Sequence, residues 1–247
     1  MSARVHHIDR APAAAPERLD NQSPQLFGQT PSQTVGPFFH FGLPWKGGAD
    51  LTGPSDLGAR LDLIPQGHYE LREPSAQPWP LAPLGERIEI GGEVLDERGA
   101  ALPDALLEIW QANAAGRYRS AADPRASLAL DPAFFGFGRA ATDREGRFLF
   151  RTVRPGRVPF GESDRPMQAP HIALGVLGRG LLKRLVTRIY FEDEASNADD
   201  PVLALVPEQR RATLIARRVA PTASTSVATY RFDVHLQGER ETVFFEF

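Results

Sequence analysis

The sequence predicts an all-β protein, an antiparallel β-sandwich with long loops and one or two short helices. From residue 85 onward, short apolar segments alternate with turn residues. The chain also holds 22 Gly and 22 Pro among 247 residues, which divides it into short elements. We expect a flexible tail at residues 1–28, an extended arm with irregular loops at 29–84, and a sandwich at 85–247.

The first 84 residues carry little regular pattern. Residues 1–28 have no apolar periodicity, so the adjacent His6 and His7 are expected to be solvated rather than to bind metal. Prolines within residues 29–45 prevent a long helix. Because the segment also contains several phenylalanines, whose apolar rings are more stable when buried, we expect this arm to lie extended over another surface. Residues 46–84 are rich in Gly and Pro and predict loops with one short helix or hairpin.

The remainder predicts seven strands and one helix. The strands are expected at residues 86–94, 106–110, 147–153, 171–177, 185–191, 230–236 and 242–247. Within 231–236 the alternation directs Phe232, Val234 and Leu236 to the core. It directs Asp233 and His235 outward. Turns are predicted at 96–99, 143–146 and the glycine pair 136–138, and a short helix at 207–214.

The composition argues against several classes of function. Lys and Arg total 28 against 31 Asp and Glu, so no basic field attracts nucleic acid or anionic lipid. Cysteine is absent, which excludes thiolate metal sites and cysteine nucleophiles and fits a reducing cytoplasm. No apolar run reaches about 18 residues, so we expect a soluble cytoplasmic protein. The acidic residues 192–194 and 199–200 lack EF-hand spacing and are interpreted as a solvated corner.

His171 stands at the start of an apolar run, residues 170–177, that predicts a buried strand. A second chelating histidine on the same face would lie two residues on, and that position is Ala173. A lone imidazole does not hold iron, so His171 is interpreted as a hydrogen-bonded structural histidine. The sequence also lacks a G-x-S-x-G motif and a P-loop.

Six segments together resemble the intradiol ring-cleavage dioxygenases. They are residues 31–43, 106–119, 135–156, 166–180, 187–194 and 230–247. The resemblance runs from about residue 29 to the C-terminus. It implies a β-sandwich whose catalytic members bind ferric iron (Fe³⁺) through two tyrosines and two histidines, the histidines in a His-x-His strand.

The resemblance also implies that this chain has lost most of that ligand set. His171 keeps a vestigial ligand position, whereas Ala173 replaces the second histidine and Val158 replaces one tyrosine. The other tyrosine is expected near residues 126–127, but residues 119–133 contain none. No metal ligand set and no catalytic residue are therefore expected in this chain.

Other positions depart from the family pattern. Gln168 stands where the family has an active-site arginine, and Arg188 stands where it has a glutamine. The remaining tyrosines Tyr118, Tyr190 and Tyr230 are interpreted as core or interface aromatics rather than relocated ligands.

Family members built from two kinds of chain suggest a role for a chain without iron. The resemblance is to the α-type chain, which pairs with an iron-bearing β subunit and lines the pocket for a small aromatic substrate at the interface. Carried over by motif, the lining residues are Thr34, Gly36, Pro37 and Arg179. A glycine–proline pair permits close backbone approach, and an arginine attracts a substrate carboxylate. Without the resemblance, the pair indicates an ordinary turn and Arg179 a surface charge.

The predicted function is thus a non-catalytic subunit of an αβ intradiol dioxygenase. One alternative is a stand-alone binding or scaffold sandwich. Another is a homomeric dioxygenase with substitute ligands, for which His40 and His68 are the remaining candidates, in loops that give no chelating geometry. The apolar residues Phe38, Phe39, Phe41 and 243–247 are expected either to contact another subunit or to cover this chain's own core.

Overall fold

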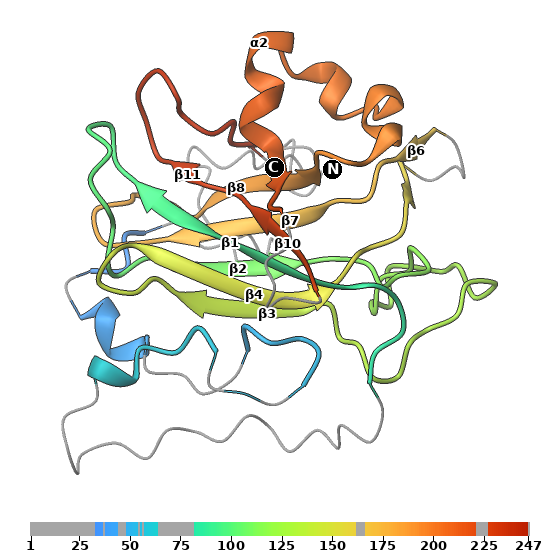
Figure 1. Ribbon diagram of the computed structural model, residues 1–247, viewed down its shortest axis with the longest axis horizontal. Helices are drawn as coiled ribbons and strands as arrows, with labels where there is room; N and C mark the ends of the chain where they lie inside the picture. Colours follow the sequence, from blue (N-terminus) through green and yellow to red (C-terminus); the bar gives the residue numbers. More distant parts are fainter. Residues whose placement is uncertain are drawn as a thin grey trace, which may run out of the picture.

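We analysed a computed structural model of the chain (Figure 1). The structure describes residues 33–36, 38–43, 48–53, 55, 57–63, 82–161, 166–220 and 227–246. The predicted tail, Pro37 and His68 lie outside the described residues, as do the side chains of His40 and Phe41.

The described part of the chain is dominated by a nine-stranded sheet that folds over a shared core. Its strand order is β11-β1-β10-β9-β8-β7-β2-β3, and β4 pairs with β1. The strands are β1 Arg87–Leu95, β2 Leu106–Trp110, β3 Phe137–Ala141, β4 Arg147–Val153, β7 Ile172–Leu177, β8 Leu185–Phe191, β9 Ile215–Arg218, β10 Ala228–Arg231 and β11 Val234–His235. A separate pair joins β5 Val158–Pro159 to β6 Met167–Gln168. The predicted all-β class is confirmed.

The sheet is mixed rather than purely antiparallel. Strand β1 runs parallel to β10 and β11, and β8 runs parallel to β9. Parallel neighbours need a long connection instead of a hairpin, and β1 is separated from β10 by most of the sandwich sequence. Alternation within a strand does not reveal such pairings, so the prediction of an antiparallel sheet was incomplete.

Two predicted elements were wrong, and one strand was not predicted. The glycine pair 136–138, interpreted as a turn, leads into strand β3. A Cβ at Gly138 would lie 2.5 Å from the Leu51 side chain and 2.9 Å from the Gly48 carbonyl oxygen, so this glycine permits close packing. Strand β9 was not predicted, because two of its four residues are exposed arginines. Residues 242–246, predicted as a strand, form none, although Val243 and Phe245 pack against buried residues.

The main core lies between two sets of strands. Strands β1 and β4 contribute inward side chains from one side, and β2 and β7 from the other. The largest of these are Ile88, Ile90, Phe148, Phe150, Leu107, Ile109, Ile172 and Leu174. Phe232 and Val234 are buried, as predicted, whereas Leu236 and His235 are both half-buried.

Short helices flank the sheet. The predicted helix at 207–214 is confirmed as α2 Glu208–Arg211, which continues as the 3-10 helix η6 Ala212–Leu214. The other described 3-10 helices are η2 Phe39–Gly42, η3 Leu61–Leu63, η4 Ala195–Asp199 and η5 Leu203–Leu205. Among the described residues, no helix has the length and apolar character needed to cross a membrane.

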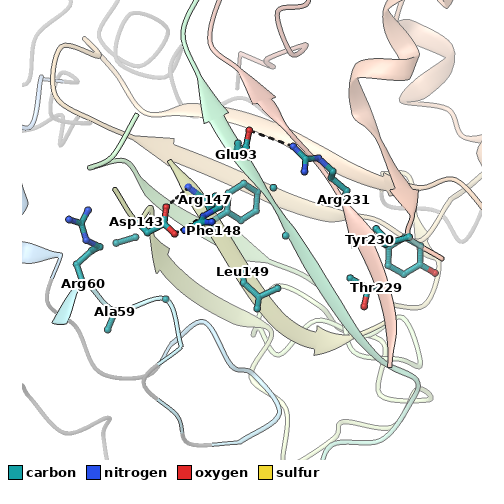
Figure 2. Close-up of a pocket in the computed structure, with 15 residues that line it drawn as sticks. Ala59, Arg60, Glu93, Asp143, Arg147, Phe148, Leu149, Thr229, Tyr230 and Arg231 are labelled. Atoms are coloured by element: carbon teal, nitrogen blue, oxygen red, sulfur yellow. Dashed lines mark hydrogen bonds and ion pairs between the residues drawn. The ribbon is translucent and has the colours of Figure 1, made fainter. Parts of the chain in front are cut away.

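A hollow of about 500 Å³ lies on the outer face of β1, β4 and β10 (Figure 2). Gly91, in the middle of β1, contributes no side chain there. The charged groups around it are paired, Arg231 with Glu93 at 3.5 Å and Arg147 with Asp143 at 2.9 Å. The charges around this hollow therefore compensate one another, and its lining includes none of the predicted site residues that the structure describes.

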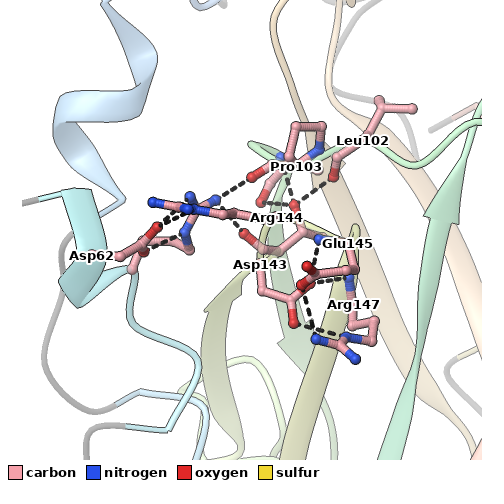
Figure 3. A network of polar contacts seen from close by, with 10 residues as sticks. Asp62, Leu102, Pro103, Asp143, Arg144, Glu145 and Arg147 are labelled. Carbon is pink, nitrogen blue, oxygen red and sulfur yellow. Dashed lines mark hydrogen bonds and ion pairs between the residues drawn. The ribbon is translucent and has the colours of Figure 1, made fainter.

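The segment that ends in η3 is anchored to the sandwich by Arg60. The buried Arg60 guanidinium donates to the carbonyl oxygens of Pro103 and Thr142, and it binds both carboxylate oxygens of Asp62. Asp62 also pairs with Arg144 at 3.3 Å (Figure 3). The hydrogen bonds from Arg60 lower the pKa of Asp62 to about 2. Through this network, the segment that contains Arg60 and Asp62 is fixed to the sandwich.

Candidate functional sites at the two ends of strand β7

Strand β7 connects the two places that the sequence marked as functional. His171 directly precedes the strand, and Arg179 follows its last residue by two. At about 3.3 Å per residue, these two positions lie roughly 25 Å apart along the chain direction. The predicted substrate-binding arginine and the vestigial ligand position therefore belong to separate sites.

At the first site, Arg179 projects from the turn that follows β7. Its side chain is 50% exposed, and its Nε forms an ion pair with Asp104. Among the described residues, no other ion pair involves Arg179. The side chain is held in place through Nε, which leaves the terminal guanidinium nitrogens available for a second, bidentate contact.

The arm approaches the same end of the sandwich. Thr34 is exposed, and Gly36 adopts φ +76°, a conformation that side chains disfavour. A Cβ at Gly36 would have nothing within 4 Å, so the backbone faces open space. Following η2, Leu43 is buried in a small apolar cluster with Leu106 and Ala141, against which Phe39, Leu63 and Leu177 pack. Leu177 is two residues from Arg179, so the arm and the arginine share one end of the sheet.

The substrate-binding roles of Thr34, Gly36, Pro37 and Arg179 remain predictions. The structure brings the arm and Arg179 to the same end, and Pro37 lies outside the described residues.

At the second site, His171 is buried and neutral. Its Nδ1 donates to the carbonyl oxygen of Ala169 at 2.8 Å, and its ring lies 5.6 Å from that of Tyr190. Burial, followed by the charge of Arg188, lowers the pKa of His171 to about 4. The imidazole thus has the geometry of the structural histidine that the sequence indicated.

A polar network surrounds this histidine. Arg188 Nη1 donates to Gln168 Oε1 at 2.6 Å and to the Tyr190 hydroxyl at 3.3 Å, and that hydroxyl donates to Asp200 at 3.2 Å. Asp200 is buried and also accepts from three backbone N–H groups. Arg188 is paired across the sheet with Ala173, whose small side chain leaves room on that face for the guanidinium.

The residues at this end do not fit a ferric ion. They offer one imidazole and the phenol of Tyr118, and the buried Val158 has no ligand atom. The guanidinium of Arg188 adds a positive charge next to the imidazole, which opposes a second cation. Within the described part of the chain, no group of three or more His, Cys, Asp or Glu side chains has a metal-binding arrangement. We therefore assign no metal-dependent step to this chain.

The acidic segment after β8 is more ordered than the sequence suggested. Asp193 and Glu194 form ion pairs with Arg154 at 3.0 and 3.3 Å, and Asp200 is buried. The interpretation as a solvated corner was wrong for the buried Asp200, whereas Glu192, Asp193 and Asp199 are exposed. The pairing arises because Arg154, at the end of β4, lies beside the end of β8.

The three tyrosines that the structure describes divide into two groups. Tyr190 and Tyr230 are fully buried, as expected of core aromatics. Tyr118 is only half-buried and lines a hollow together with Trp110 and Val158. Sequence reasoning missed this grouping, because Tyr118 and Val158 are forty positions apart and no periodicity links a residue in a loop to one in the two-residue strand β5.

Together, the fold and the two sites define an all-β protein with an arginine and a glycine-containing arm at one end and a buried, hydrogen-bonded histidine at the other. Comparison with known proteins shows to which family this all-β protein belongs. The family Dioxygenase_C, described as Dioxygenase, matches residues 70–238. The chain therefore belongs to the intradiol dioxygenase family.

Individual relatives are consistent with that membership. The chain is 42% identical to the protocatechuate 3,4-dioxygenase alpha chain of Burkholderia cepacia, over 88% of this chain and 97% of that protein. It is also 42% identical to the beta chain from that organism, over 79% and 77%. The crystal structure of 3-chlorocatechol 1,2-dioxygenase from Rhodococcus opacus 1CP is 25% identical with a TM-score of 0.50, over 62% of this chain. The match spans 60% of that enzyme's length.

Proposed function

We propose that this chain is the non-catalytic α subunit of a protocatechuate 3,4-dioxygenase. It would pair with an iron-bearing β subunit, and the pair would cleave protocatechuate between its two hydroxylated carbons. Both atoms of O₂ enter the product, 3-carboxy-cis,cis-muconate, a step of the β-ketoadipate pathway. In this proposal the ferric iron is held by the β subunit.

One observation supports this assignment above the others. The similarity to an alpha chain extends over 97% of that relative, while Val158 and Ala173 stand where the family has metal ligands. A stand-alone scaffold is not favoured, because nothing in such a role requires similarity along the whole length of a dioxygenase subunit.

The contribution of this chain would be substrate recognition at the shared interface. Arg179 carries an accessible guanidinium, tethered at Nε, that can bind the ring carboxylate of protocatechuate. The exposed Thr34 and the open backbone at Gly36 would line the same pocket, with Pro37 next to them. A preorganised arginine lowers the entropic cost of binding a planar carboxylate.

The test of this role is Arg179→Gln, co-expressed with the β subunit. Loss of a charge-assisted hydrogen bond costs about 1.5–3 kcal/mol, so kcat/KM for protocatechuate should fall about ten- to a hundredfold. Arg184→Gln is the matched control, because Arg184 is similarly exposed (48%) and lies on the same connection to β8. An unchanged kcat/KM in Arg179→Gln would remove the arginine from the proposal.

The subunit assignment itself is tested by expressing the chain alone and with its β partner. Alone, it should purify without stoichiometric iron and without the visible absorption of tyrosinate–iron complexes. With β, the two should co-purify as a coloured, active complex. Stoichiometric iron and colour in the isolated chain contradict the assignment.

A further inference from the structure

Asp104 faces Arg179 across the ends of two paired strands. Strands β2 and β7 run antiparallel, and Leu106, the first residue of β2, is the partner of Leu177, the last residue of β7. Asp104 stands two residues before the first of these and Arg179 two residues after the second, so the register brings them opposite each other. The ion pair between Asp104 Oδ2 and Arg179 Nε therefore follows from the pairing of the strands.

On the Arg179 side, the backbone forms a tight turn. The Leu181 N–H donates to the Gly178 carbonyl oxygen at 3.3 Å, and Gly180 adopts φ +83°. A positive φ at the third residue of a four-residue turn is typical of type II, and glycine adopts it without steric cost. The turn fixes where the Arg179 side chain leaves the backbone. It does not by itself order the rest of this long, half-exposed side chain.

On the Asp104 side, the backbone is held at both neighbouring residues. The carbonyl oxygen of Pro103 accepts from the buried Arg60 guanidinium (Figure 3). The Ala105 N–H donates to Thr142 Oγ1 at 2.9 Å, and the Thr142 N–H donates to the Ala105 carbonyl oxygen at 2.9 Å. The Asp104 side chain is only 17% exposed. It therefore offers Arg179 a carboxylate whose position is fixed by the surrounding structure.

The Asp104 carboxylate lies within reach of two guanidinium groups. Among the described residues, its Oδ2 is buried and has no conventional hydrogen bond, and it contacts Arg179 as an ion pair. The pKa of Arg60 is raised first by its hydrogen bond to Asp62, and the charge of Asp104 acts in the same direction. A buried carboxylate oxygen without a counter-charge is costly, so Asp104 should restrain Arg179 more strongly than a fully exposed partner would.

We propose that Asp104 is a positioning residue for Arg179 and thereby sets the preference for a substrate that carries a carboxylate. By occupying Nε, Asp104 closes the approach that uses Nε and one terminal nitrogen, and it leaves the approach through Nη1 and Nη2. The substrate carboxylate would bind on that other edge, where water screens its repulsion from Asp104. The inference rests on the proposed function, because it assumes that Arg179 binds the substrate.

The first measurement uses the isolated full-length chain without substrate. In ¹H–¹⁵N spectra of arginine side chains, the Nε–Hε signal of Arg179 is identified by its loss in Arg179→Gln. We expect this signal to differ from that of free arginine and to show the heteronuclear NOE of an ordered group. Asp104→Asn should move both towards the values of free arginine.

Glu108→Gln is the matched control for this measurement. The Glu108 side chain is similarly shielded, at 15% exposed, and it pairs with Arg139 at 2.6 Å. It lies on β2, four residues after Asp104, and forms no described ion pair with Arg179. The Arg179 signal should therefore be the same in Glu108→Gln as in the unaltered chain.

The second measurement uses the complex with the β subunit. Asp104→Asn should raise KM for protocatechuate about two- to tenfold, because binding must then order one more flexible side chain. It should leave kcat unchanged, because the reaction does not alter the ring carboxylate. The inhibition constant of catechol, which lacks that carboxylate, should not change. In an Arg179→Gln background, Asp104→Asn should have no further effect, whereas a folding defect would act in both backgrounds.

The two measurements separate this inference from the proposed function. An unchanged Nε–Hε signal in Asp104→Asn overturns the inference, and so does a lower KM, which would mean that Asp104 only offsets the charge of Arg179. If Arg179→Gln lowers kcat/KM while Asp104→Asn leaves KM unaltered, the inference fails alone. If Arg179→Gln is itself unimpaired, the substrate-binding role of Arg179 fails and the inference fails with it.

Discussion

His171 shows how burial and one neighbouring charge set the protonation state of a side chain. The imidazole is 5% exposed and lies close enough to Arg188 for that charge to lower its pKa. Asp200 and the Ala169 carbonyl act in the opposite direction, but burial dominates. In the unfolded chain the same imidazole would titrate near pH 6.5.

The stability of the protein should therefore depend on pH through His171. Between pH 6.5 and about 4 the unfolded chain binds a proton that the folded chain does not, so the stabilisation is complete above pH 6.5 and is lost as the pH falls towards 4. The difference between the pKa of His171 in the unfolded and in the folded chain corresponds to about 3 kcal/mol of unfolding free energy. Urea unfolding at pH 7.5, 5.5 and 4.5 should show this loss, and His171→Gln should reduce it. His235→Gln is the comparison and should have a smaller effect, because that imidazole is only half-buried.

The same site shows what a sequence reveals about individual residues. The replacement of ligands by Val158 and Ala173 could be predicted, since it depends only on residue identity at matched positions. The bond between Arg188 and Gln168 could not, because it depends on two residues twenty positions apart on different strands. The hollow beside Tyr118 was missed for the same reason.

At the scale of the strands, glycines mark where the chain passes close to itself. A Cβ at Gly92 in β1 would lie 1.8 Å from the carbonyl oxygen of Phe232, between the two strands that run parallel to β1. A Cβ at Gly175 in β7 would instead meet the end of the Arg184 side chain at 2.2 Å. Backbone cannot move aside without breaking sheet pairing, whereas an exposed arginine can change its rotamer.

The two glycines therefore give a matched pair of variants. Gly92→Ala should lower the free energy of unfolding by about 1–3 kcal/mol or more, because β1 must separate from the C-terminal strands. Gly175→Ala should change it by less than about 1 kcal/mol. Urea unfolding of both variants measures the difference. Equal effects would show that the Phe232 carbonyl moves as easily as a side chain.

The strands also show why part of the fold was missed. Strands with alternating or continuous apolar residues, such as β1 and β7, could be predicted within a residue or two. Strand β3 contains a glycine and an arginine, and β9 ends in two exposed arginines, so neither has a hydrophobic pattern. Their strand character comes from pairing with β2 and with β8 and β10, which is information carried by distant parts of the chain.

At the scale of the whole molecule, the two ends of β7 carry different surfaces. The turn after β7 bears Arg179 and, three residues later, Leu182, which is 80% exposed. At the His171 end, η5 bears Leu205, which is 76% exposed, beside the buried cluster that contains Tyr190. If Arg179 reaches into a pocket shared with a β subunit, the surface around Leu182 must lie at or next to the interface, and Leu205 must lie away from it.

This difference predicts where the partner binds. Leu182→Glu places a charge in an apolar contact, so it should weaken the αβ complex about tenfold or more. Leu205→Glu is matched in residue type and exposure and should leave the dissociation constant unchanged. Sedimentation of each variant with the β subunit, over a range of concentrations, measures both effects, and the unfolding midpoints of the isolated variants control for folding. If Leu205→Glu disrupts assembly while Leu182→Glu does not, the partner covers the His171 end, and Arg179 does not contribute to a shared pocket.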